Sequence, residues 1–355
     1  MGYGLKQRAG AIVLDWPRYE WGLRTSWLHI CNRNERLQTS PDGRGVECEW
    51  QWTSDLHAAK VFPSLGSRLM ERALKDWPIE FDKPAEPINS PVQVSFIIGH
   101  RGGQRLPHLL ATLGTIASQG GVVSECIVVE QSEQSEIQGH LPPWVRYVHS
   151  PLPTANIPYC RAWTLNVGAR MANGKLLIFH DNDLLVPKSY AAECWARYQE
   201  GFEVINLKRF IFYLEEKHSS KIQLRREFDL SQPPVVIMQN AEAGGSLAVA
   251  RDAFFAIGGY DESFVGWGGE DNEFWERAQT RRVWSYGYLP IVHLWHAAQP
   301  RKTDLDNPTL RHYEKLSSMA VVDRIAELNK RNFGQTERLS VDWTSAISAP
   351  NVKAE

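Results

Sequence analysis

The chain has 355 residues, of which 43% are hydrophobic and 23% are charged, and its formal net charge at pH 7 is −2. This composition is typical of a globular protein with a sizeable core, and the balanced charge excludes the strongly basic surface of a nucleic-acid-binding protein. No apolar run approaches the length of a membrane span, and the N-terminal stretch does not have the pattern of a signal peptide. Five cysteines without metal-ligand spacing fit a reducing compartment, so we expect a cytoplasmic location and leave peripheral membrane association open.

A proline-bearing connector at residues 81–92 divides the chain into two regions. The first, residues 1–88, combines short alternating runs with a helical pattern near residues 64–75. It predicts a small N-terminal α+β extension and carries no motif that indicates a role. A second domain is predicted over residues 92–335, followed by a C-terminal tail at residues 336–355.

In the second domain, apolar strand patterns alternate with helical ones. Strands are predicted at residues 93–98, 125–130, 146–150 and 175–181, and helices at residues 105–119 and 158–172. This alternation predicts an α/β fold with a mostly parallel sheet flanked by helices. Ligands bind at the carboxyl ends of the strands in such sheets, so residues 99–101, 130–131 and 181–183 should gather at one edge.

The fourth predicted strand ends in HDNDL, which places Asp181 and Asp183 two residues apart at this edge. With one residue between them, both carboxylates could face a divalent cation bound to a diphosphate, and oxygen ligands suit Mg²⁺ or Mn²⁺. The alternative is an Asx turn that closes the strand. We favour the metal site because of its position in the sheet.

A second candidate is HLWH, which follows the strand-like run LPIV. In an extended segment His293 and His296 would face opposite sides, so only one of them is expected to reach a metal, and the other would be a structural residue. A nitrogen ligand beside two carboxylates favours Mn²⁺.

The segment GGYDESFVGWGGEDNEFWER, at residues 258–277, carries the strongest functional signal. Its glycines permit close approach of the backbone to a ligand, and Trp267 offers a flat apolar face on which a ring could lie. Glu270 and Asp271 lie where a helix should begin, and carboxylates are favoured at that end. A glycine-rich turn followed by a capped helix is the structural alternative, but it does not explain Trp267.

Two arginines are candidates for binding phosphate. Arg101 lies in the loop IIGHRGG after the first strand, and it could equally be a surface residue. Arg161 lies in the first turn of a predicted helix, where a positive charge opposes the helix dipole, and this mild conflict indicates a ligand.

Several segments in the same order resemble the glycosyltransferases of the GT-A fold, and most of all the β-1,4-galactosyltransferase group and related family 2 enzymes. The likeness spans roughly residues 92–313. The segments are QVSFIIGHRGGQRLPHLLATL, IVVEQS, CRAWTLNVGARMANGKLLIFHDND, GGSLAVARDAFFAIGGYDESFVGWGGEDNEF and HLWH.

The resemblance implies a role for each motif. Asp181 and Asp183 would hold Mn²⁺ or Mg²⁺ on the diphosphate of a UDP-sugar, with His296 as a further ligand and His293 as the second choice. Asp271, beside Glu270, would be the catalytic base. The contacts with the donor would come from Gly99, Arg101, Glu130, Gln131, Arg161, Asp181 and Asn182, and those with the acceptor from Trp267, Gly268, Gly269 and Glu270.

One departure affects the nucleotide. Family 2 enzymes usually have Asp after the second strand to bind uracil, whereas this chain has Glu130 and Gln131. The family's animal members carry a membrane anchor, and no such segment is found in this sequence.

The expected function is metal-dependent, inverting transfer of a hexose or N-acetylhexosamine from a UDP-sugar to a saccharide or glycoconjugate acceptor. Two alternatives from other classes remain open. A non-catalytic carbohydrate-binding protein of the same fold would not need the retained acids, and a nucleotidyltransferase would need a basic triphosphate loop that GHRGGQR resembles only loosely.

Overall fold

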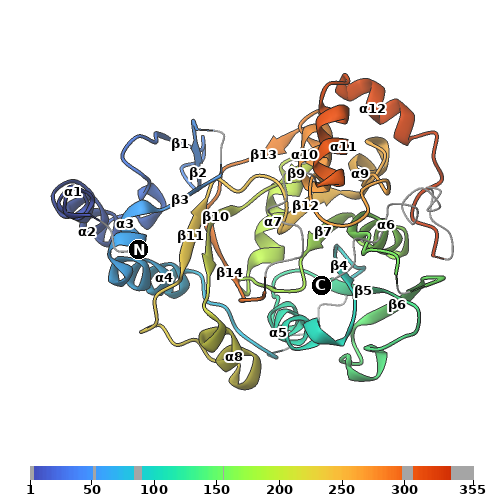
Figure 1. Cartoon of the computed structure of the whole chain (residues 1–355), viewed down its shortest axis with the longest axis horizontal. Helices are drawn as coiled ribbons and strands as arrows, with labels where there is room; N and C mark the ends of the chain where they lie inside the picture. Colours follow the sequence, from blue (N-terminus) through green and yellow to red (C-terminus); the bar gives the residue numbers. More distant parts are fainter. Residues whose placement is uncertain (1–3, 51–52, 84–89, 155, 298–306, 337–355) are drawn as a thin grey trace, which may run out of the picture.

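The computed structural model describes residues 4–50, 53–83, 90–154, 156–297 and 307–336, which form two sheets with helices around them (Figure 1). The predicted tail lies almost wholly outside the described residues. None of the helices in the described ranges is both long and apolar enough for a membrane span.

The larger sheet has seven strands in the order β13-β9-β12-β7-β4-β5-β6. Strands β7, β4, β5 and β6 are parallel neighbours, and β12 runs antiparallel between β7 and β9. The predicted strands are all present, within a few residues of the predicted bounds. The strands are β4 (Val94–His100), β5 (Ser124–Ser132), β6 (Arg146–Pro151), β7 (Leu176–His180), β9 (Val204–Ile205), β12 (Ser246–Ala250) and β13 (Val283–Trp284).

Helices cover both faces of this sheet, as the sequence predicts. Alternate residues of β4 point to opposite faces, so Phe96 packs with α5 (Leu106–Ala117) and α7 (Tyr190–Gln199), whereas Ile97 packs with α6 (Arg161–Met171). The other helices of the described domain are α8 (Glu216–Arg225), α9 (Arg251–Ala256), α10 (Glu270–Ala278), α11 (Pro308–Ser317) and α12 (Val321–Leu328).

Helix α6 begins at Arg161 and not at Pro158 as predicted. The residues before it are held in another conformation, because the Cys160 amide donates to the Gln131 side chain at 2.8 Å. The consequence is that Arg161 becomes the first residue of the helix and lies directly at the edge of the sheet.

A second, five-stranded sheet was not predicted, and it has the order β3-β11-β10-β14-β8. Only β10 and β14 are parallel in it. Its strands come from distant parts of the chain: β3 (Ser54–Asp55), β8 (Leu184–Leu185), β10 (Lys208–Tyr213), β11 (Val236–Gln239) and β14 (Leu289–His293).

The first eighty residues pack against this second sheet. Leu65 and Leu69 of α4 (Pro63–Asp76), which matches the predicted helix, share one core with Phe210 and Val292. In Figure 1 these N-terminal elements lie beside β11. They are α1 (Leu5–Gly10), the π-helical turn at Ala11–Asp15, α2 (Trp16–Arg24), a 3₁₀ turn at Trp27–His29, β1 (Leu37–Thr39), β2 (Val46–Cys48) and α3 (His57–Val61).

Candidate active site

Asp183 lies at the centre of a group of potential metal ligands. Its buried carboxylate has the His296 Nε2 atom 3.5 Å from Oδ2 and the His293 Nε2 atom 3.8 Å from Oδ1. Ligand atoms of these three residues all lie within 4.8 Å of one another. The two strands that carry them are paired, since β8 directly follows Asp183 and runs antiparallel to the end of β14.

Both histidines therefore lie close to the same carboxylate, and which of them binds a metal stays a prediction. They do not face opposite sides because β14 ends at His293, so the alternation of an extended strand does not continue to His296. The Nδ1 atom of each ring lies 2.7 Å from a backbone carbonyl oxygen, that of Leu294 or Ala297. A carbonyl accepts a hydrogen bond, so Nδ1 of each ring carries a proton, and Nε2 is the ring nitrogen that faces Asp183.

This donor set fits Mn²⁺. One carboxylate and two imidazoles offer one hard oxygen and two nitrogen ligands, a mixture that suits Mn²⁺ better than Mg²⁺. The backbone carbonyls that hold Nδ1 also fix the orientation of the rings, as they do around many metal-binding histidines.

Asp181 is held apart from this group by Arg161. The Nε and Nη2 atoms of Arg161 donate to Asp181 Oδ1 at 2.9 and 2.7 Å, while Nη1 donates to Asp271 Oδ1 at 2.6 Å. One guanidinium thus joins the end of β7 to the start of α10, which are distant in the sequence. A direct contact between Asp181 and a metal stays a prediction.

The surroundings shift the acidity of the carboxyl groups in opposite directions. Burial raises the pKa of Asp181 despite its pairing with Arg161. Burial would also raise the pKa of Asp183, but attraction to His293, Arg105 and His296 outweighs it and lowers the pKa overall. Burial, and then repulsion from Asp271, raises the pKa of Glu270 to about 7.

Arg105, which the sequence analysis did not single out, donates from Nη1 to Asp183 Oδ2 at 2.6 Å. It lies just before α5, in a 3₁₀ turn at Gly103–Arg105. No local motif marks it, because its contact with Asp183 depends on how β4 and β7 pair in the sheet.

The glycine-rich segment brings Asp271 to the site as the start of α10. Gly266, Gly268 and Gly269 have φ values of 100°, 106° and 90°, which side-chain-bearing residues rarely adopt. Among the described residues no side chain caps this helix. Since the Asp271 carboxylate pairs with Arg161 instead, helix capping does not account for it.

Trp267, predicted to contact the acceptor, is 39% exposed within this segment. Its backbone oxygen accepts a hydrogen bond from Asn307 Nδ2 at 2.9 Å, which ties the loop to the start of α11. The predicted acceptor-contacting residues 267–270 thus form one continuous stretch that leads into Asp271.

A second loop, at Gly244 and Gly245, contacts Asp181 and Asp271, and the sequence analysis gave these two residues no role although they lie in a segment of the resemblance. The Asp181 amide donates to the Gly245 carbonyl at 2.8 Å. A Cβ at Gly244 would lie only 2.7 Å from Asp271 Oδ2. Lys208, a buried residue of β10, holds the loop through Nζ, which donates to the carbonyls of Gly244 at 3.1 Å and Ser246 at 2.7 Å.

The predicted donor-binding residues of the first loop lie at the same edge. A Cβ at Gly99 would collide with Tyr159 and Thr164, so this position requires glycine. Arg101 donates from Nη1 to the Ile157 carbonyl at 2.6 Å. Asn182 donates from Nδ2 to His100 Nδ1 at 2.9 Å, which links the HDND turn to the end of β4.

Glu130 and Gln131 are fully buried at the end of β5. The Glu130 carboxylate accepts from the backbone amide of Glu136 at 3.0 Å and from Tyr147 Oη at 2.5 Å. Both side chains are engaged by the protein itself, Glu130 through these bonds and Gln131 through its bond with the Cys160 amide. The role of Glu130 and Gln131 in donor binding stays a prediction.

Comparison with known proteins gives one family match. Residues 228–288, which include β11, β12, α9, α10 and the whole glycine-rich segment, match a family model described as the N-terminal domain of galactosyltransferase. The probable N-acetylgalactosaminyltransferase 9 of Caenorhabditis elegans is 39% identical over 70 residues, which is 19% of this chain. The chain matches about a tenth (11%) of the length of that curated relative.

Two solved structures match part of the chain at low identity. The catalytic domain of Drosophila β-1,4-galactosyltransferase 7, in complex with xylobiose, has a TM-score of 0.36 and 18% identity, over 65% of this chain and 83% of that one. GalNAc-T7 with UDP, GalNAc and Mn²⁺ has a TM-score of 0.45 and 16% identity, over 68% of this chain and 54% of that one. By its galactosyltransferase segment and its mixed α/β fold, the chain is similar to the GT-A glycosyltransferases.

Proposed function

We propose that this protein is a metal-dependent, inverting glycosyltransferase. It would move a hexose or N-acetylhexosamine from a UDP-sugar to a hydroxyl group of a saccharide or glycoconjugate. The observation that carries the proposal is the pair of contacts made by Arg161, which bring Asp271 beside Asp181. Asp181 precedes Asp183 by two positions in the sequence, and Asp183 forms the candidate metal group with His293 and His296. These contacts support the proposal, because the proposed proton acceptor and the residues proposed to hold the cation lie at one edge of the sheet.

Asp183, His293 and His296 would hold the ion, and Mn²⁺ bound there would neutralise charge on the departing diphosphate. Arg161, with one guanidinium group shared by two carboxylates, orients Asp271 and offers positive charge close to the diphosphate. Asp271 would accept the proton of the acceptor hydroxyl as its oxygen attacks the anomeric carbon. Attack from the face opposite the leaving group inverts that carbon.

The acceptor would bind along residues 266–270. The exposed ring of Trp267 offers an apolar face to a sugar, and the glycines on both sides let the acceptor approach the backbone closely. Binding holds the acceptor hydroxyl near Asp271 before the reaction begins. The entropic cost of bringing the reacting groups together is then already met, which lowers the activation barrier of the transfer by several kcal/mol.

A thermal-shift panel of nucleotide sugars with and without Mn²⁺ tests this proposal and identifies the donor. We expect the melting temperature to rise with one or a few UDP-sugars, and to rise far more when Mn²⁺ is present. Release of free sugar and UDP from that donor would exclude a non-catalytic protein. Release of pyrophosphate from UTP and a sugar 1-phosphate, without release of UDP from any UDP-sugar, would contradict the proposal and indicate a nucleotidyltransferase.

A further inference from the structure

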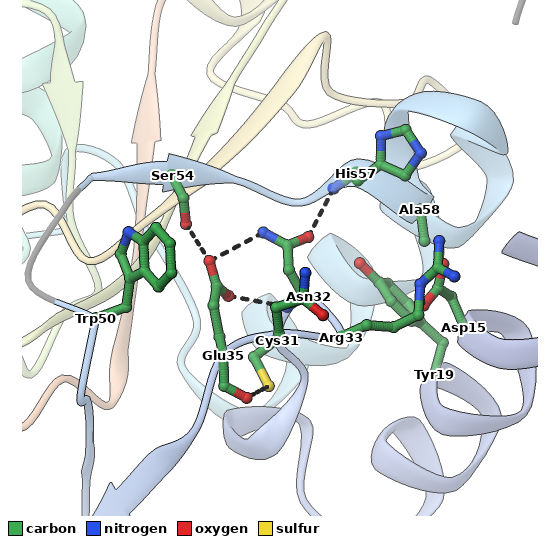
Figure 2. Close-up of a pocket in the computed structure, with 11 residues that line it drawn as sticks. Asp15, Tyr19, Cys31, Asn32, Arg33, Glu35, Trp50, Ser54, His57 and Ala58 are labelled. Carbon is green, nitrogen blue, oxygen red and sulfur yellow. Dashed lines mark hydrogen bonds and ion pairs between the residues drawn. The ribbon is translucent and has the colours of Figure 1, made fainter. Parts of the chain in front are cut away.

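A separate cavity lies among the N-terminal elements and takes no part in the site described above. It has a volume of about 500 Å³, within the range of small-molecule sites. Its walls come from the first helices, the segment before β1, the end of the β1–β2 hairpin, β3 and the start of α3 (Figure 2).

One wall of the cavity is a fixed polar network. The Glu35 carboxylate accepts hydrogen bonds from Asn32 Nδ2 at 3.1 Å and from Ser54 Oγ at 2.6 Å. The Asn32 Oδ1 atom in turn accepts from the His57 amide at 2.9 Å (Figure 2). These side chains are held before any ligand arrives, so a ligand would not need to order them.

The charges of the cavity are already paired. Arg33 Nε lies 3.0 Å from Asp15 Oδ1, and Glu35 is surrounded by hydrogen-bond donors. A charged ligand would have to displace one of these partners, whereas a neutral ligand would not. The cavity is therefore suited to a neutral, polar molecule.

The Tyr19 hydroxyl is buried and has no hydrogen-bond partner among the described residues. It points into the cavity in Figure 2. Burial, and then the charge of Asp15, raises the pKa of Tyr19, so the hydroxyl keeps its proton and can donate as well as accept. A buried polar group without a partner is costly, and a ligand hydroxyl would satisfy it.

The Trp50 ring forms an aromatic wall of the cavity and is half exposed to solvent. Sugar rings combine hydroxyl groups at their edge with an apolar face of C–H groups. A pre-ordered polar wall, an unused hydroxyl and an aromatic face together match that chemistry.

We infer that this cavity binds a neutral sugar residue of the acceptor glycan, at a subsite apart from the place of transfer. That this sugar belongs to the acceptor rests on the proposed function, whereas saccharide binding in the cavity does not depend on it. It would give the N-terminal region, for which the sequence indicates no role, a part in substrate recognition.

A short path connects the two sites. The Gln239 side chain at the end of β11 donates to Glu35 and to Ser54 Oγ. Five residues later, Gly244 packs against the Asp271 carboxylate. Five residues of extended chain span at most about 17 Å, so this segment brings the polar wall of the cavity and the Asp271 carboxylate into one part of the molecule.

The test measures binding of two neutral disaccharides, lactose and cellobiose, by saturation-transfer NMR and calorimetry, without UDP or metal. Tyr19→Phe removes only the unpaired hydroxyl, and Trp50→Ala removes the aromatic wall. We expect Tyr19→Phe to weaken binding about fivefold, the effect of one hydrogen bond, and Trp50→Ala to weaken it at least as much. Trp144→Ala, at an exposed tryptophan outside the cavity, is the matched control and should bind like the wild type.

Two results would overturn the inference: no binding of either disaccharide to the wild type, or equal binding by the wild type and Trp50→Ala. Melting temperatures of all variants exclude unfolding as the cause of a loss. Metal-dependent UDP binding is measured on the same samples, so a failure of the proposed function would be seen separately from a failure of this subsite.

Discussion

Arg161 is the residue at which the contacts of the candidate active site meet. As the first residue of α6 its side chain reaches both the end of β7 and the start of α10, where it pairs with Asp181 and Asp271. The sequence already made Arg161 conspicuous, because a positive charge in the first turn opposes the helix dipole. The two carboxylates compensate for that conflict.

Asp271→Asn tests whether Asp271 accepts the proton of the acceptor hydroxyl, separately from binding of the donor. Asparagine keeps the size of the side chain but cannot act as a base at neutral pH, so turnover should fall by roughly 10²–10⁴-fold. Binding of UDP with Mn²⁺ should stay close to that of the wild type, as measured by calorimetry. Near-normal turnover by this variant would show that another group accepts the proton.

Glu270 has a different environment from its neighbour. It is buried, and its pKa is raised to about 7 by burial and by Asp271. In the unfolded chain a glutamate releases its proton near pH 4.5. Between these two values the folded state binds more protons than the unfolded state, so the free energy of unfolding decreases as the pH rises from about 4.5 to about 7.

Glu270→Gln should remove this dependence, since glutamine is neutral throughout. The variant should gain stability over the wild type as the pH rises, by roughly 2–3 kcal/mol at about pH 8, and little at about pH 4. Chemical denaturation at a series of pH values measures the difference. A difference that does not change with pH would contradict the raised pKa.

At the scale of elements, the strands and helices of the larger sheet could be predicted because each carries its own periodic pattern. The strand around Phe96 is buried along almost its whole length, as expected for a parallel strand covered on both faces. The second sheet could not be predicted in this way. Strands β3 and β8 have two residues each, too few for a pattern, and their partners lie far away in the sequence.

The same limit applies to the candidate site. The acids at the end of β7 and the glycine-rich segment were found because a motif surrounds them. Arg105 and Gly244 were not, because they matter only through contacts that the fold creates. The contact of both histidines with Asp183 was also missed, since the end of β14 decides it.

The loop with Gly244 offers a controlled test at this scale. Gly244→Ala would place a Cβ on a residue with a φ of 72°, which should cost about 1–2 kcal/mol of stability. The same Cβ would lie 2.7 Å from Asp271 Oδ2, so it should also displace that carboxylate. Gly43 has the same φ, but a Cβ added there would have nothing within 4 Å. Gly43→Ala should therefore carry the same backbone cost and keep full transferase activity. Equal activities of the two variants would contradict the placement of Asp271 against this loop.

At the scale of the whole molecule, the described chain has three hydrophobic clusters, one on each face of the larger sheet and one beneath the N-terminal elements. The candidate active site lies where they come together: α6 and α10 belong to one face of the larger sheet, and β8 and β14 belong to the smaller sheet. Residues from both sheets are therefore needed to complete it. The smaller sheet also carries β3, through which the N-terminal region is joined to the rest.

The central claim is that Asp183, His293 and His296 bind a cation that in turn holds the diphosphate of a UDP-sugar. Calorimetry of UDP with the wild type and with Asp183→Asn, each with and without Mn²⁺, tests it most directly. The account predicts that Mn²⁺ tightens UDP binding at least tenfold in the wild type and has no such effect in the variant. The melting temperature of the variant without ligands shows whether it folds. Equal UDP affinity with and without Mn²⁺ in the wild type, or an undiminished effect of Mn²⁺ in Asp183→Asn, would contradict it.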